Sequence, residues 1–165
     1  MKTLYLIRHA KSSWDDANQS DFERPLNKRG EHDAPIMAKL LKENNFKPGL
    51  VLSSPANRAY TTAQIFAEEF QYPFDKIITD DRIYEAGIRE LMTVVRELDD
   101  QNQTVLLFGH NPGLTSLTNL LGDKFIPEMP TCAIVGLKFD VNAWGEIERH
   151  GGKMFLFDYP KKHSK

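Results

Sequence analysis

Cysteine is almost absent from this chain of 165 residues, and long apolar runs are absent as well. Cys132 stands alone, which excludes an intrachain disulfide and a cysteine-based metal cluster. No stretch approaches the roughly 18 apolar residues of a membrane span. The run at residues 4–7 is shorter than the apolar segment of about 7–15 residues in a secretion signal. We therefore expect a cytoplasmic protein without a membrane partner.

An excess of either charge is also missing. The 21 Lys and Arg side chains nearly balance the 23 Asp and Glu side chains, and the net charge is -2 at pH 7. Such a balance produces no chain-wide field for nucleic acid or anionic lipid, so we expect no nucleic-acid partner. The length and the ordinary content of apolar residues predict one globular domain over residues 1–165.

Predicted strands and helices alternate along the chain. Continuous apolar runs predict buried strands at residues 4–7, 50–52, 76–79 (the weakest) and 104–108. Apolar residues at helical spacing predict helices over residues 28–44, 55–70, 88–98 and 112–122. This alternation predicts an α/β fold of three layers, αβα, with a mostly parallel central sheet covered by helices on both faces.

The ends of these helices and the C-terminal part carry further signals. Ser54 and Asn111 are predicted N-caps, and Pro35 is expected to kink or split its helix because it lacks an N–H donor. Residues 133–141 and 146–150 flank a segment with turn chemistry. They predict an antiparallel β-hairpin at the sheet edge.

Basic side chains follow three of the predicted strands. Arg8 and His9 follow the first strand, His110 follows the fourth, and Arg58 lies in the first turn of the helix after the second. In doubly wound sheets, ligands bind beyond the carboxyl ends of the strands. We therefore expect these four side chains to meet at one edge of the sheet.

The residue types in this cluster suit phosphoryl transfer. Guanidinium groups are planar, permanently charged forks that match phosphate oxygens. A neutral His9 imidazole can attack phosphorus and form a phosphohistidine intermediate, with Arg8, Arg58 and His110 neutralising the oxygens. We expect neither a metal nor a cofactor. By chain order Glu85 is the best-placed general acid, although a carboxylate there can equally serve as a charge at a helix N-terminus.

A polar loop is predicted over residues 11–25, and its length makes a functional role reasonable. Its position makes Ser12 and Trp14 candidate substrate contacts. Arg24 is either a substrate contact or a structural anchor of the loop. Asn111, next to His110, is a further candidate for substrate binding.

Four motifs follow one another along the chain: residues 6–10 (LIRHA), 24–26 (RPL) with Gly30, 53–59 (SSPANRA) with residues 62–63 (TA), and 109–112 (GHNP). Together and in this order they resemble the histidine phosphatase superfamily, the phosphoglycerate-mutase-like or RHG enzymes, and most nearly its short SixA-type phosphohistidine phosphatases. Trp144 and the late hairpin resemble that branch too.

The resemblance implies that His9 accepts the phosphoryl group, that Arg8, Arg58 and His110 hold its oxygens, and that Glu85 donates a proton, without a metal. Two departures stand out. Ala10 replaces the usual glycine, and the mutase-type asparagine is missing where residues 12–14 read SSW. The second departure weakens a mutase assignment.

The expected activity is therefore that of a metal-independent phosphatase. The chain has no long insertion between Arg58 and His110 that could form a cap over the pocket. An uncapped pocket favours phosphohistidine on a protein partner as the substrate. Two alternatives stay open: a phosphatase for small phosphate esters such as sugar phosphates, and a phosphate-binding module without turnover.

Overall fold

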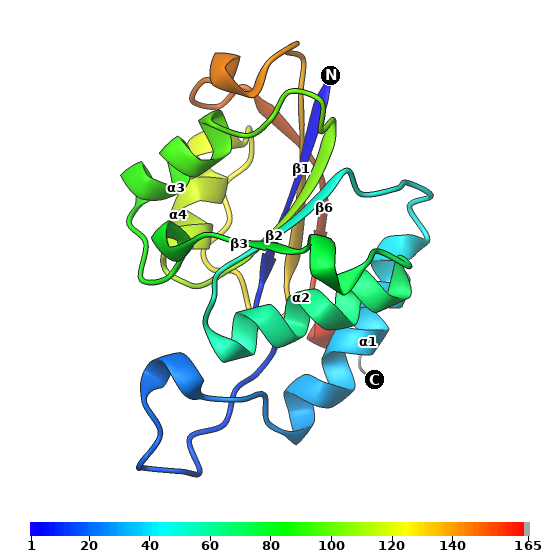
Figure 1. Cartoon of the computed structure of the whole chain (residues 1–165). Helices are drawn as coiled ribbons and strands as arrows, with labels where there is room; N and C mark the ends of the chain where they lie inside the picture. The colour runs from blue at the N-terminus through cyan, green and yellow to red at the C-terminus, as the bar shows by residue number, and fades with distance from the viewer. Residues whose placement is uncertain (164–165) are drawn as a thin grey trace.

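The computed structural model describes residues 1–163, which form a six-stranded sheet with helices on both faces (Figure 1). The strand order is β3-β2-β4-β1-β5-β6. The strands are β1 (Lys2–Arg8), β2 (Leu50–Ser53), β3 (Ile78–Thr79), β4 (Thr104–Gly109), β5 (Ile134–Phe139) and β6 (Gly152–Asp158). The helices are α1 (Lys28–Lys42), α2 (Asn57–Glu69), α3 (Ile88–Arg96) and α4 (Gly113–Leu121).

The sheet is parallel through its centre and antiparallel at one edge. β1, β2, β3 and β4 are mutually parallel, whereas β5 runs antiparallel to β1 and β6 antiparallel to β5. Arg8 pairs with Gly109 at the carboxyl ends of β1 and β4. The register therefore places the residues that follow β1 and β4 side by side, and the predicted fold class is confirmed.

Two apolar cores lie on opposite faces of the sheet. Side chains alternate along β1, so Leu4 and Leu6 pack in the core beneath α3 and α4, whereas Tyr5 and Ile7 pack in the core beneath α1 and α2. Figure 1 shows the same arrangement, with α3 and α4 on one side of the strands and α1 and α2 on the other. The continuous apolar run of β1 is thus explained by burial on both faces.

The position of the last strand differs from the prediction. The second hairpin strand was expected at residues 146–150, but β6 begins only at Gly152. Residues 144–146 form a 3-10 turn in which the Trp144 indole donates to the Asn102 carbonyl at 2.7 Å. The Trp144 backbone N–H donates to Asp100 Oδ1 at 2.8 Å. These contacts to a distant loop hold the segment out of the sheet.

Both predicted N-caps were wrong. Ala56 holds the capping position of α2 in place of Ser54, and Pro112 holds that of α4 in place of Asn111. The Ser54 hydroxyl instead accepts a hydrogen bond from the Ala56 N–H at 3.2 Å. α1 runs unbroken through Pro35, so the helix is not split there, and its buried residues on both sides of Pro35 pack into one core. Among the helices of residues 1–163, none has the length and apolar character needed to cross a bilayer.

Candidate active site

The two histidines predicted from the strand ends lie together beyond the carboxyl edge of the sheet. The centroids of the His9 and His110 rings are 5.2 Å apart. β1 delivers Arg8 and His9, β4 delivers His110, and the first turn of α2 delivers Arg58. The strand register therefore accounts for the convergence of segments that are far apart in sequence.

His9 is held in one tautomer. Its Nδ1 lies 2.8 Å from the Ala10 carbonyl oxygen, which can only accept, so Nδ1 carries the proton and Nε2 keeps its lone pair. Burial lowers the pKa of His9 to about 3, and the charges of His110, Arg58 and Arg8 act in the same direction, against the hydrogen bond to Ala10. The imidazole is therefore neutral near pH 7, and its Nε2 carries a free lone pair.

The backbone around His9 tolerates alanine in place of glycine. Ala10 does not adopt a positive φ, and its N–H donates to the Thr62 hydroxyl at 3.0 Å. That hydroxyl in turn donates to the Arg58 carbonyl at 2.7 Å. Thr62 therefore connects the segment that follows His9 to the first turn of α2, which carries Arg58.

His110 faces the same space from β4. Its Nε2 lies 2.8 Å from the Ser54 hydroxyl, and its buried Nδ1 has no hydrogen-bond partner. Burial lowers the pKa of His110 to about 4, with the Arg58 charge as the next cause, and the Asp21 charge opposes the shift. The ring is neutral near pH 7, and its Nδ1 is available to a ligand.

Three guanidinium groups keep unpartnered donors in this cluster. Arg8 donates through Nη1 to the Met129 carbonyl at 2.9 Å, yet its Nε is buried without a partner. The same holds for Nε of Arg58 and for Nε and Nη1 of Arg24. A buried donor left unpaired costs about 1–3 kcal/mol. Several such donors on cationic groups therefore fit an anionic ligand.

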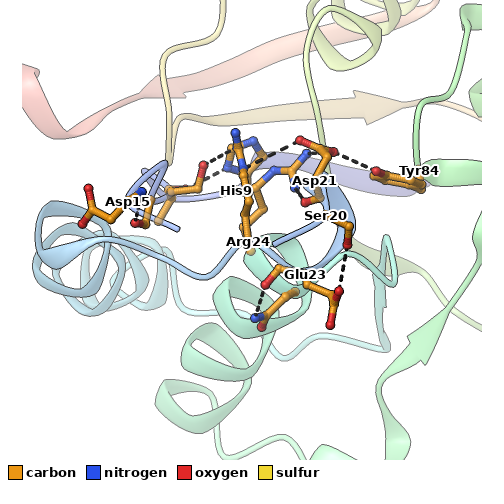
Figure 2. Close-up of polar contacts among 12 residues, drawn as sticks. His9, Asp15, Ser20, Asp21, Glu23, Arg24 and Tyr84 are labelled. Carbon is orange, nitrogen blue, oxygen red and sulfur yellow. Dashed lines mark hydrogen bonds and ion pairs between the residues drawn. The ribbon is translucent and has the colours of Figure 1, made fainter. Parts of the chain in front are cut away.

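The loop of residues 11–25 lines one side of a hollow beside His9, and Figure 2 shows Asp21 and Arg24 of this loop near His9. Arg24 Nη2 donates to the Ser12 hydroxyl at 2.6 Å, and the Trp14 ring centroid lies 3.3 Å from the Arg24 guanidinium carbon. Ser12, Trp14 and Arg24 line a hollow of about 440 Å³ together with Arg8 and His9. All three loop candidates thus lie where the sequence placed them, and Arg24 anchors the loop while keeping free donors.

The other two candidates, Glu85 and Asn111, do not line the hollow beside His9. Glu85 is exposed, has a φ of 55° and lies in the turn that follows Tyr84. Asn111 donates to the Met129 carbonyl at 2.8 Å, the oxygen that also accepts from Arg8, and its Oδ1 accepts from the Thr115 N–H at 3.3 Å. The capping position of α4 falls on Pro112. Asn111 therefore shares an anchor with Arg8.

Two residues of the site escaped the sequence analysis. Asp21 accepts hydrogen bonds from Arg58 and from the Tyr84 hydroxyl, and the Tyr84 ring packs edge-on against His110 at 5.6 Å. Nothing in the local sequence distinguishes Asp21 from the other three acidic residues of its loop. Within residues 1–163, no group of three or more His, Cys, Asp or Glu side chains is arranged to hold a metal.

Comparison with known proteins agrees with this geometry. The family model of the histidine phosphatase superfamily (branch 1) matches residues 4–101. An Arabidopsis thaliana chloroplast protein of uncharacterised function is 31% identical over 153 residues, which make up 88% of this chain and 70% of that protein.

Two solved structures share the fold. A candidate phosphohistidine phosphatase SixA from Agrobacterium tumefaciens is 27% identical, with a TM-score of 0.81 over 96% of this chain and 98% of that one. The protein histidine phosphatase SixA complexed with tungstate is 22% identical, with a TM-score of 0.82 over 98% of this chain and 99% of that one. The family model and the similarity to the Agrobacterium tumefaciens protein support a phosphatase activity. Since the family model covers more than half of the sequence, the chain belongs to the histidine phosphatase superfamily, with the fold of its SixA-type members.

Proposed function

We propose that this protein is a metal-independent phosphatase that takes a phosphoryl group onto His9 Nε2 and removes it from phosphohistidine on a partner protein. One observation carries the proposal. An unprotonated imidazole nitrogen of His9 shares a hollow with Arg8 and Arg24, whose buried Nε donors have no hydrogen-bond partner among residues 1–163. A nucleophile beside paired cationic forks is the arrangement that transfer of a phosphoryl dianion requires.

The reaction would proceed in two displacements. Arg8 and Arg58 hold the phosphoryl oxygens, His9 Nε2 forms a bond to phosphorus, and the bond from phosphorus to the substrate imidazole nitrogen breaks. The leaving imidazole takes up a proton, for which Glu85 is the proposed donor. Water then attacks the phosphohistidine, which releases inorganic phosphate and returns His9 to its neutral form.

The segment between Arg58 and His110 supports a side chain on a protein as the substrate. This segment consists of α2, β3, α3 and β4 of the layered fold with short connections, and it holds no inserted cap domain. A phosphorylated imidazole that projects from another protein can therefore reach the pocket. The similarity to a candidate SixA-type phosphohistidine phosphatase from Agrobacterium tumefaciens points to the same substrate class.

A labelling experiment tests the proposed nucleophile. Incubation with a ³²P-phosphohistidine protein and rapid quenching should yield an acid-labile, alkali-stable label on the enzyme. His9→Ala should abolish both the label and turnover, whereas EDTA should leave the rate within about twofold because the arginines neutralise the charge. Full turnover by His9→Ala, or activity that EDTA removes and Mg²⁺ restores, would refute the mechanism.

A substrate comparison tests the proposed substrate class. The values of kcat/KM are measured for a phosphohistidine peptide and for a sugar phosphate at matched concentrations. Imidazole is a better leaving group than an alkoxide, so Glu85→Gln should slow ester hydrolysis more than phosphohistidine hydrolysis. A much higher kcat/KM for the sugar phosphate would assign the protein to the ester phosphatases instead.

A further inference from the structure

The carboxylate of Asp21 lies against the far end of the Arg58 guanidinium. Arg58 Nη1 donates to the Asp21 carbonyl oxygen at 2.7 Å, and Nη2 donates to Asp21 Oδ2 at 3.0 Å. Both terminal nitrogens of Arg58 are thus engaged by a single residue of the loop. The Arg58 side chain is buried with 8% exposure, so this contact constrains it strongly.

This contact leaves one edge of Arg58 free. A guanidinium has five N–H donors in a fixed plane, and its end and its Nε edge can each bind a pair of acceptors. Asp21 takes the end, whereas Nε is buried and has no partner. The Nε edge, with the second hydrogen of Nη2, therefore remains as a fork for two phosphoryl oxygens.

Tyr84 holds Asp21 in turn. Its hydroxyl donates to Asp21 Oδ2 at 2.7 Å, the same oxygen that accepts from Arg58, and Figure 2 shows this contact. The Tyr84 ring packs edge-on against His110 on one side and against Phe22 on the other, at centroid distances of 5.6 and 5.2 Å. The phenol therefore has a fixed orientation although it lies near the surface.

The charge of Asp21 is maintained in this setting. Burial alone would raise the pKa of its carboxyl, but the hydrogen bonds from Tyr84 and Arg58 and the charges of Arg58 and Arg24 outweigh burial and lower it. Arg24 Nε lies 3.7 Å from Asp21 Oδ1. An anionic Asp21 thus faces two guanidinium groups of the pocket and a phenol from the turn that leads to Glu85.

We propose that Asp21 and Tyr84 are positioning residues that fix the end of Arg58, so that its Nε edge points at the transferred phosphoryl group. Substrate binding then requires no displacement of the carboxylate, because carboxylate and phosphate use different edges of the guanidinium. This inference rests on the proposed function, since it assigns a role within the same pocket.

Steady-state kinetics on the phosphohistidine substrate, with inorganic phosphate as the competitive inhibitor, tests the inference. Asp21→Ala should lower kcat by about 10–100-fold and raise the Ki of phosphate, because a charge-assisted hydrogen bond that orders the donor is lost. Asp21→Asn keeps an acceptor for Arg58 and should recover most of the loss. Tyr84→Phe, which removes only the hydroxyl, should lower kcat several-fold.

Asp16→Ala is the matched control. Asp16 lies in the same loop, is exposed, and its side chain accepts only from the Asn18 N–H, so the variant carries the same charge change and should keep kcat within about twofold. Tighter phosphate inhibition in Asp21→Ala would overturn the inference, because the carboxylate would then be a competitor of phosphate. An unchanged kcat in Asp21→Ala would overturn it as well.

A double-mutant cycle shows whether Asp21 acts through Arg58. In an Arg58→Ala background, Asp21→Ala should change kcat/KM by less than about twofold, because the group that it positions is gone. A full additional loss would overturn the positioning role. The His9→Ala variant separates this inference from the proposed function. If His9→Ala loses the label while the Asp21 variants keep full activity, only the inference is refuted. If the label survives in His9→Ala, the proposed function is refuted.

Discussion

The buried neutral His9 should make the stability of the fold depend on pH in a defined window. An unfolded chain binds a proton on this histidine below a pKa of about 6.5, whereas burial lowers its pKa to about 3 in the folded protein. Between these two values the unfolded state binds more protons. The free energy of unfolding therefore rises with pH across this window, and the contribution of His9 is lost as the pH falls from about 6.5 toward 3.

The size of the effect follows from the two pKa values. At pH 5 the unfolded imidazole is almost fully protonated and the folded one almost fully neutral. Lowering the pH from 6 to 5 should therefore cost about 1 kcal/mol of unfolding free energy through His9 alone. This figure changes little for any folded pKa below about 4, because the folded group then stays neutral throughout.

Urea unfolding of wild type and His9→Asn at pH 6 and pH 5 measures this contribution. Asparagine cannot titrate, and its amide N–H can replace the Nδ1 donor to the Ala10 carbonyl. The loss of stability between the two pH values should be smaller in His9→Asn by about 1 kcal/mol. His32→Asn, at an exposed position of α1, controls for the substitution. Equal losses in wild type and His9→Asn, or an NMR titration of His9 near pH 6.5, would refute the reasoning.

Three further changes have defined outcomes. Arg58→Ala should lower kcat by about 10²–10³-fold, as the loss of one preorganised donor does elsewhere, and a loss below threefold in stopped-flow assays would contradict its role. Gly30→Ala should destabilise the fold by about 1–3 kcal/mol in urea unfolding, because the new Cβ would lie 2.2 Å from the Lys11 carbonyl oxygen. Trp14→Ala should raise KM about two- to fivefold, since an exposed cation–π contact with Arg24 is worth about 0.5–1 kcal/mol, and an unchanged KM would show that Arg24 is held without it.

The sequence predicted the parts of this protein that repeat a simple pattern. The positions of β1 and β4 were predicted from their apolar runs, which reflect burial on both faces of the sheet. The meeting of His9 and His110 was predicted from their places at the ends of these strands, as was the position of Arg8. These predictions succeed because strand ends in a parallel sheet meet at one edge.

Features set by contacts between distant loops were not predictable in this way. The delayed start of β6 depends on hydrogen bonds from Trp144 to Asp100 and Asn102. The role of Asp21 depends on Arg58 and Tyr84, which lie on other elements. Such contacts leave no periodic pattern in the sequence, so they can be identified only in the folded structure.

The single cysteine offers a way to measure opening of the candidate active site. Cys132 is fully buried, and its backbone N–H donates to the His9 carbonyl at 3.0 Å. Burial raises the pKa of its thiol, so the thiol stays protonated in the folded protein. Protonation and shielding from solvent both slow its reaction with thiol reagents. The rate at which a thiol reagent modifies the native protein will therefore report how often the strand end carrying His9 separates from its neighbour, without any added probe.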